Sequence, residues 1–109
     1  MTVKVITDST SDIGPELAEA LNITVVPIYV RFGDQAYRDG IDITSDEFYE
    51  RLSVSPVHPA TSLPTPGDFA SVYSEHVSRS EGIVSIHISS RVSGTCESAL
   101  LAKKIVGDV

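Results

Sequence analysis

The chain is poor in cysteine, in basic side chains and in long apolar runs, and each shortage excludes a class of protein. Cys96 is the single cysteine, so we exclude an internal disulfide framework and expect a reducing compartment. The chain has 8 Lys and Arg residues but 15 Asp and Glu residues, and the resulting formal charge of -7 disfavours a nucleic-acid surface built on phosphate contacts. No apolar run approaches the roughly 20 residues of a membrane span, and residues 3–7 resemble a short strand rather than a signal peptide. We therefore expect a cytoplasmic protein with no nucleic-acid partner and no stable membrane insertion.

The sequence also lacks the common catalytic and metal-binding signatures. It contains no phosphate loop, no G-x-G-x-x-G and no G-x-S-x-G nucleophile elbow. Oxygen-bearing side chains between Asp8 and Glu19 fall at ligand positions of a calcium loop, but Ile13 occupies the position that requires glycine. Cys96 lies in the first turn of a predicted helix, where a small apolar residue explains it as well as a thiolate. We therefore expect no catalytic residue, no metal and no cofactor.

What the sequence does contain is an alternation of strand and helix patterns typical of one domain. Apolar runs predict strands over residues 3–7, 23–32 and 83–89, with Pro27 marking an edge or a bulge in the second. The spacing of apolar residues and the capping residues predict helices that begin at Pro15, near Thr44, after Thr65 and at Gly94. The alternation predicts an α/β fold, with a mainly parallel sheet and flanking helices.

Three details of this prediction concern packing and loops. Leu17, Ala20 and Leu21 mark the expected buried face of the first helix, which Asn22 ends. The helix over residues 94–106 is apolar around most of its circumference. Residues 53–64 are expected to form a long loop, rich in proline and without structure of its own.

Two hydroxyl-rich segments are the clearest sign of function. Residues 61–69 read Thr-Ser-Leu-Pro-Thr-Pro-Gly-Asp-Phe, and residues 89–95 read Ser-Ser-Arg-Val-Ser-Gly-Thr. Each precedes a predicted helix, and the amide groups and dipole of a helix start favour an anion. The alternative is local turn and capping chemistry, in which the hydroxyls bond only their own backbone. Placed at one edge of a parallel sheet, the two segments would form a cradle for a small anionic group.

Two further polar features adjoin this predicted edge. Residues 8–12 form a polar turn that we expect to cap the first helix and to border a pocket. His87 lies on the face of its strand opposite Ile86 and Ile88, either as a core histidine or as a pocket wall. We favour the structural role.

Three segments together resemble the DegV family, in order and in separation. They are Val5-Ile6-Thr7-Asp8-Ser9-Thr10-Ser11-Asp12, Thr61-Ser62-Leu63-Pro64-Thr65-Pro66-Gly67-Asp68-Phe69 and Ile88-Ser89-Ser90-Arg91-Val92-Ser93-Gly94-Thr95. The resemblance covers the whole chain, and the combination of three segments is far more specific than any one of them.

The resemblance implies a bacterial lipid-binding protein rather than an enzyme. DegV proteins bind fatty acids, and several carry the acyl group for a separate fatty acid kinase subunit that phosphorylates the carboxylate for phospholipid synthesis. By position in the motifs, the hydroxyls of Thr61, Ser62 and Ser93 would hold the carboxylate, with Gly94 and Thr95 as their backbone setting. The acyl chain would lie in an apolar tunnel between the layers.

The resemblance also implies a missing part and leaves other functions open. Family members are more than twice as long, so residues 1–109 are expected to form an amino-terminal domain without the second, carboxyl-terminal domain. The alternatives are a phosphotransfer enzyme domain, since a helix start with hydroxyls also suits phosphate, and a regulatory or structural domain that only binds a partner.

Overall fold

A parallel sheet forms one half of the molecule. In the computed structural model, which describes residues 3–54, 57–88, 91, 93–107 and 109, strand β1 (Val3–Asp8) lies between β2 (Ile23–Val26) and β6 (Gly82–Ile86). Both neighbours run parallel to β1. The carboxyl ends of the strands therefore lie at one edge, where open α/β sheets bind their ligands. The predicted α/β class with a parallel sheet and flanking helices is confirmed.

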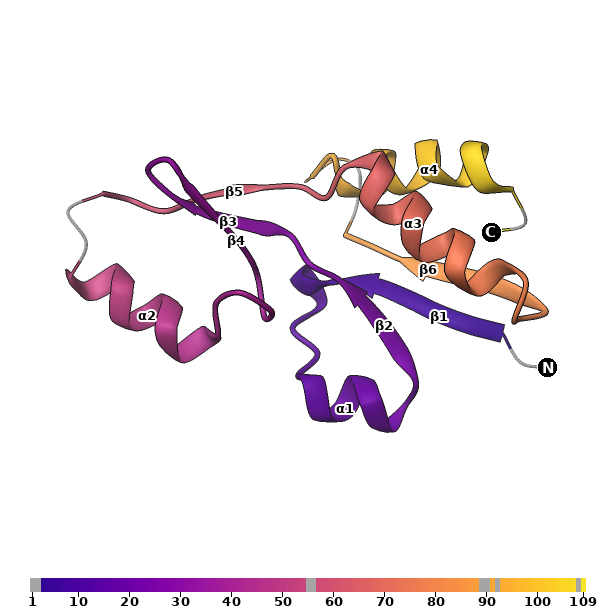
Figure 1. The fold of residues 1–109 in the computed structure, drawn as a ribbon, viewed down its shortest axis with the longest axis horizontal. Coiled ribbons are helices and arrows are strands. Elements are labelled where there is room, and N and C mark those ends of the chain that lie inside the picture. Colours follow the sequence, from indigo (N-terminus) through magenta and orange to yellow (C-terminus); the bar gives the residue numbers. More distant parts are fainter. Residues whose placement is uncertain (1–2, 55–56, 89–90, 92, 108) are drawn as a thin grey trace.

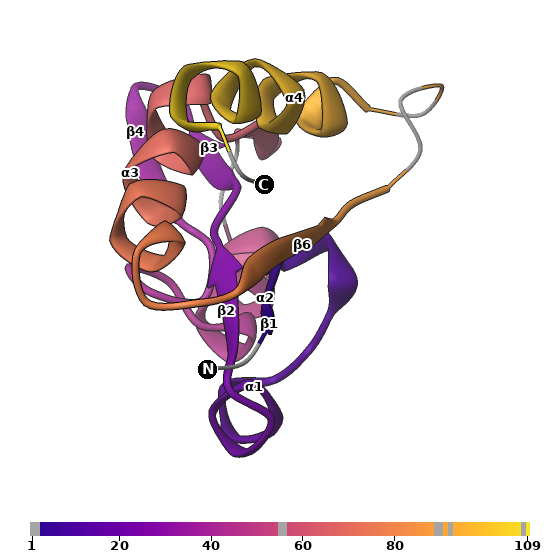
Figure 2. The same ribbon diagram turned by 90° about the vertical axis from the view of Figure 1, so that its right-hand side faces the viewer.

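Helices cover this sheet on both sides. The long helices α3 (Pro66–Val77) and α4 (Thr95–Val106) lie together over one face, and the short α1 (Pro15–Ala20) lies on the other side (Figures 1 and 2). Ile6 of β1, Phe69 and Tyr73 of α3 and Ala102 of α4 are all 0% exposed and form the centre of the core. Burial of a side chain as large as Phe69 contributes roughly 1.5–3 kcal/mol, so this layer provides much of the stability.

A second, antiparallel sheet extends away from the first. It consists of β3 (Tyr29–Phe32), β4 (Gln35–Arg38) and β5 (Ala60–Ser62) in the order β4-β3-β5, with α2 (Ser45–Val54) beside it (Figure 1). Gly33, with φ of 63°, allows the tight turn between β3 and β4. The sequence analysis did not predict this sheet.

Two predictions about the course of the chain were wrong in part. Residues 23–32 form two strands in different sheets, because Pro27 has no N–H to continue the first ladder. Residues 53–64 contain the end of α2 and the whole of β5 rather than an unstructured loop. β5 forms because it pairs with β3, with Thr61 opposite Val30. A local sequence pattern does not reveal a partner so distant in the chain.

Predictions of which residues are buried also need correction. Leu17 and Leu21 are 53% and 60% exposed, and the small Ala18 is the buried residue of α1. In α4, Leu100, Leu101 and Ile105 are at least half exposed, and the helix meets the core through Ala99 and Ala102. Small side chains at these contacts allow a helix to approach its neighbours closely, a criterion that hydrophobicity alone does not capture.

The polar turn after β1 caps a different helix from the one predicted. Asp8 accepts a hydrogen bond from the backbone of Thr10 and caps a 3-10 turn, η1 (Ser9–Ser11). The N-cap of α1 is Gly14, which provides no side-chain hydrogen bond. Asn22 ends the α1 segment with a left-handed φ of 55°, as predicted.

Candidate functional site

The first predicted segment lies at the start of α3. Thr61 and Ser62 belong to β5, where they pair with Val30 and Tyr29 of β3. Thr61 is exposed and Ser62 is half-buried. Because successive side chains of a strand point to opposite faces, the two hydroxyls lie on opposite sides of the strand, and an anion on one side meets one side-chain hydroxyl directly.

A rigid turn joins this strand to the helix. Pro64 is fully buried, and Thr65 caps α3 by accepting a hydrogen bond from the Asp68 amide (3.1 Å). The Thr65 amide in turn donates to Asp68 Oδ2 (2.9 Å), which completes the capping box. Tyr29 of β3 donates to the same carboxylate oxygen (3.0 Å). The predicted cap is confirmed, and it also ties the antiparallel sheet to α3.

The second predicted segment lies at the start of α4. Ser93 and Gly94 are half-buried, and Thr95, the first residue of the helix, is 1% exposed. The Thr95 amide donates to Ser93 Oγ (3.2 Å), and the Ser93 and Thr95 hydroxyl oxygens lie 2.9 Å apart. Gly94 occupies the N-cap position without a side-chain hydrogen bond. Ser89, Ser90 and Val92 of the same motif lie outside the described residues.

The structure brings the two segments together at one point. A Cβ atom added to Gly94 would lie 3.3 Å from Leu63 Cδ1 and 3.7 Å from Cδ2, so the Leu63 side chain covers this glycine. Leu63 directly follows Ser62, and Gly94 directly follows Ser93. The two predicted halves of the cradle are therefore neighbours in space, although they come from different layers of the fold.

Sequence analysis missed a row of buried polar side chains beneath these segments. His87 Nδ1 lies 2.5 Å from Asp8 Oδ2, and its Nε2 lies 2.5 Å from Ser85 Oγ, to which Tyr73 donates (2.7 Å). Burial raises the pKa of the Tyr73 hydroxyl above its usual value. The Ser-His-Asp order is that of a hydrolase triad, but the serine lies inside a strand rather than on an exposed elbow and already accepts from Tyr73. His87 has the structural role that we favoured, and it also lines a cavity.

That cavity, of about 280 Å³, lies between β6 and α4. Its walls are mostly apolar, with Ile83, Ala99 and Leu100 among them, and Ser85 and His87 add a polar patch. Cys96, in the first turn of α4, also lines it, and Lys103 lies on its wall two turns further along the helix. Of the predicted site residues Thr61, Ser62, Ser93, Gly94 and Thr95, none is among the residues that line it.

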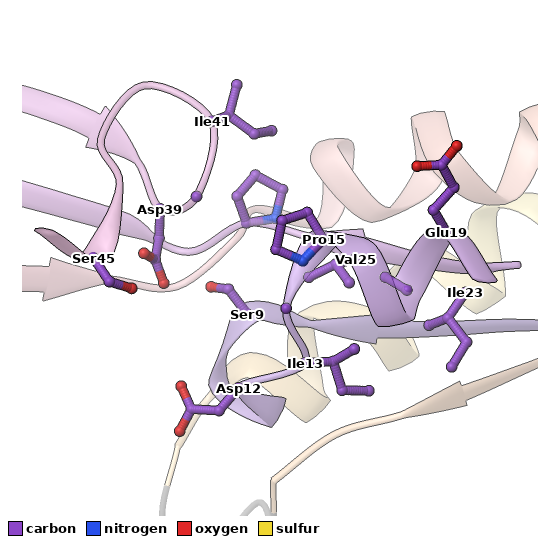
Figure 3. Close-up of a pocket in the computed structure, with 14 residues that line it drawn as sticks. Ser9, Asp12, Ile13, Pro15, Glu19, Ile23, Val25, Asp39, Ile41 and Ser45 are labelled. Carbon is purple, nitrogen blue, oxygen red and sulfur yellow. The ribbon is translucent and has the colours of Figure 1, made fainter. Parts of the chain in front are cut away.

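A larger cavity, of about 440 Å³, lies beside α1 and β2. Figure 3 shows the oxygens of Ser9, Asp39 and Ser45 gathered on one side of it, with Ile23 and Val25 on another. The polar turn was expected to border a pocket, and Ser9 and Asp12 of the turn line this cavity, while Thr10 and Ser11 line a smaller one beside His87. None of the predicted hydroxyl residues lines the larger cavity, and its carboxylates, Asp12, Glu19 and Asp39, disfavour an anion there.

The two hydroxyl segments do not share the edge of the parallel sheet, as was expected, because Thr61 and Ser62 belong to the antiparallel sheet. The fold and the site define an α/β domain in which a strand end of the antiparallel sheet adjoins the start of α4. A model of the DegV family, described as "Uncharacterised protein, DegV family", matches residues 2–109. The chain belongs to the DegV family.

Its relatives are bacterial proteins of greater length. A DegV domain-containing protein of Deinococcus radiodurans is 39% identical over 98% of this chain and 38% of its own length. Protein DegV of Bacillus subtilis is 35% identical over 100% of this chain and 39% of its own length. The chain thus spans well under half of the length of these relatives.

Solved structures of the family share the fold closely. The structure of DegV from Bacillus subtilis, a fatty acid binding protein, matches with a TM-score of 0.92 at 35% identity, over 99% of this chain and 38% of that one. A stearic acid-binding protein from Eubacterium ventriosum matches with a TM-score of 0.89 at 39% identity, over 97% of this chain and 36% of that one. Within the described residues, no helix is long and apolar enough to cross a membrane.

Proposed function

We propose that this chain is the amino-terminal domain of a fatty acid-binding protein and that it holds the fatty acid carboxylate. The contact of Leu63 with Gly94 carries the proposal, since it places the Thr61–Ser62 strand end beside the Ser93–Thr95 helix start. Related structures are of proteins that bind fatty acids, which supports the assignment of the ligand class.

The hydrogen bonds around Ser93 prepare it to donate to a ligand. Its oxygen already accepts from the Thr95 amide. When the Thr95 hydroxyl also donates across the 2.9 Å contact, the proton of Ser93 is left for an outside acceptor. A carboxylate is such an acceptor, and hydrogen bonds to a charged oxygen are stronger than neutral ones. Ser93 and one hydroxyl of the Thr61–Ser62 pair would be the side-chain donors, with Gly94 and Thr95 as their backbone support.

The acyl chain would enter the cavity between β6 and α4. Its volume of about 280 Å³ is just under the roughly 300–1,000 Å³ usual for small-molecule pockets. We therefore expect the cavity to hold part of an acyl chain, and a second domain to enclose the remainder and complete the polar contacts. Residues 1–109 would then be the first of two domains.

A protein of this kind would present its ligand to an enzyme rather than act as one. In the proposed role, a separate kinase subunit phosphorylates the bound carboxylate and this chain only holds it in place. Two other functions are distinguishable by experiment. ATP turnover by the purified protein alone would favour a phosphotransfer enzyme, and loss of partner binding with unchanged lipid affinity in a Thr61→Ala, Ser93→Ala double variant would favour a regulatory domain.

The direct test is the lipid content of the protein as its gene encodes it. Solvent extraction and mass spectrometry should find a fatty acid in the purified protein, and delipidated protein should take up palmitate. The double variant Thr61→Ala, Ser93→Ala should take up much less, and Ser71→Ala, an exposed serine of α3, should behave as the unaltered protein. Protein that carries no fatty acid and acquires none would refute the proposal.

A further inference from the structure

A fully hydrogen-bonded row of polar side chains, buried except for the half-buried Ser85, connects the ends of β1 and β6. The side chains of His87 and Asp8 are 2% and 0% exposed, and their nearest atoms lie 2.5 Å apart. The two residues are 79 positions apart in the chain. On the far side of the ring, Ser85 and Tyr73 continue the row into α3.

A neutral His87 ring satisfies every donor and acceptor in this row. Tyr73 donates to Ser85 Oγ, so the Ser85 hydroxyl is free to donate to His87 Nε2. A nitrogen that accepts at Nε2 leaves the ring proton on Nδ1, where it is donated to Asp8 Oδ2. The other oxygen of Asp8 accepts from the amide of Thr10 (2.9 Å) and from its hydroxyl. No buried polar side-chain atom among the described residues lacks a partner.

This row contacts η1 and α3, and through them it is linked to the segments that surround the candidate carboxylate site. Asp8 caps η1, and Ser9 of η1 accepts from the Ile28 amide just before β3, the strand that pairs with Ser62. Phe69, in the first turn of α3, meets the His87 ring edge to face with centroids 5.0 Å apart. The chain then runs from His87 to the second hydroxyl segment at Ser93.

We propose that the Asp8–His87 pair is a positioning device for the carboxylate site; this inference rests on the proposed function. The His87 ring has one orientation, because it makes a directional hydrogen bond at each nitrogen and an edge-to-face contact with Phe69. An apolar side chain of equal size would fill the same space without this directional constraint. The pair thereby sets the distance between the η1 end of β1 and the strand that leads to Ser93. Asp8 and His87 act on the carboxylate only through the hydroxyl segments, although His87 also forms part of the wall of the cavity proposed for the acyl chain.

The two halves of the row provide a matched comparison. Asp8→Asn keeps the size of the side chain but removes the charge that holds Nδ1–H, and His87→Phe keeps the contact with Phe69 but removes both hydrogen bonds. Ser85→Ala removes only the outer half of the row and leaves the Asp8–His87 pair intact. All three change the buried network, so a purely structural role predicts that all three alter ligand binding to the extent that they lower stability.

The measurement that separates a positioning role from a purely structural one is the ratio of the affinities for palmitate and methyl palmitate. The ester has the same acyl chain but no carboxylate charge. In protein as its gene encodes it, Asp8→Asn and His87→Phe should lower the ratio of palmitate affinity to ester affinity by about 10-fold, as loss of an orienting partner does at metal sites. The ratio is the measure because His87 also lines the cavity proposed for the acyl chain, and a change there alters both affinities alike. Ser85→Ala should leave the ratio of the two affinities unchanged even where it lowers the melting temperature.

The outcomes are distinct from those for the proposed function. If the unaltered protein does not bind palmitate, the proposed function fails. If it does bind and both Asp8→Asn and His87→Phe keep its preference for palmitate over the ester, the positioning role is overturned. The same follows if Ser85→Ala loses that preference as fully as Asp8→Asn does. Should His87→Phe fail to fold, Asp8→Asn alone decides, because it alters no packing volume.

Discussion

At the scale of single residues, the contact between Leu63 and Gly94 carries most of the account. It joins a strand of the antiparallel sheet to the start of a helix that covers the parallel sheet. Gly94 has φ of -76° and ψ of 0°, a helical conformation open to any residue. Its requirement for glycine is therefore one of space rather than backbone geometry.

Gly94→Ala should separate stability from binding. Alanine suits the backbone here, so we expect the free energy of unfolding to change by no more than about 1 kcal/mol. The new Cβ, 3.3 Å from Leu63 Cδ1, must displace this side chain by a few tenths of an ångström at the point where the two hydroxyl segments meet, and palmitate affinity should fall several-fold. Calorimetric titration and urea unfolding measure the two quantities.

Gly67→Ala is the matched control, since its new Cβ would meet Thr65 Oγ1 at an ordinary 3.6 Å. It should leave palmitate affinity unchanged. Equal affinities for both alanine variants and the unaltered protein would contradict the role assigned to the Leu63 contact.

Candidate site residues could be proposed from the sequence, but the side chains that support them could not. Hydroxyls before a helix start form a local pattern that indicated the two segments, and the resemblance to the DegV family then implied Thr61, Ser62 and Ser93. The partnership of Asp8 with His87 joins residues that are 79 positions apart and depends on two strands ending side by side. Asp8 was identified as part of a polar turn and His87 as a strand residue, but no local signal linked the two side chains to each other.

At the scale of elements, the Tyr29 side chain connects the antiparallel sheet to helix α3. Its hydroxyl donates to Asp68 Oδ2, the oxygen that also accepts from the Thr65 amide in the cap of α3. The hydrogen bond to Asp68, together with burial, raises the pKa of the Tyr29 hydroxyl above its usual value near 10. The bond anchors β3, and with it β5, to the helix start beside the candidate site.

Tyr29→Phe should therefore destabilise the fold in a pH-dependent way. The lost hydrogen bond is worth about 1 kcal/mol at neutral pH. Because the pKa of Tyr29 is raised in the folded protein, its contribution is complete below the unfolded value of about 10 and is lost as the pH rises through the folded value. Urea unfolding at pH 7 and above pH 10 should show the difference between the two proteins shrinking.

The control for this change is Tyr49→Phe in α2, where the side chain is 66% exposed. It should alter the unfolding free energy little at either pH. A Tyr29→Phe protein as stable as the unaltered one at neutral pH would show that the Asp68 contact does not anchor the strand.

The elements differ in how well local pattern predicts them. The strands of the parallel sheet and helices α3 and α4 follow from apolar periodicity and from Thr65, Pro66 and the glycine before α4. The antiparallel sheet does not, because β5 has three residues and its register is set by β3, about 30 positions earlier in the chain. Pattern also placed Leu17 and Leu21 inside the core, where the structure has Ala18.

At the scale of the whole molecule, the open side of the parallel sheet is the main feature. Val84 and Ile86 of β6 are 47% and 57% exposed, and Val3 of β1 is 53% exposed. In the described sheet β6 pairs with β1 on one side only. Since the chain spans 38% of the Deinococcus radiodurans relative, we expect further chain to cover this surface in a full-length family member.

Without such a cover, the 109-residue chain should self-associate. An exposed apolar face beside an open strand edge favours pairing between copies. Analytical ultracentrifugation should show a mean mass that rises with concentration, and Ile86→Lys should suppress the rise. Val54→Lys, at a site in α2 that is 76% exposed, should not. A chain that stays monomeric at every concentration would contradict this expectation.

The central claim is that Ser93 and the Thr61–Ser62 strand end together hold a carboxylate. The most direct measurement is the ¹³C NMR signal of palmitate labelled at its carboxyl carbon and bound to the protein as its gene encodes it. The account predicts a bound carboxyl resonance that moves in Ser93→Ala protein and in one of the Thr61→Val and Ser62→Ala proteins, the one that lacks the second donor, and that stays in place in Ser71→Ala. A carboxyl resonance identical in all of these proteins would contradict it.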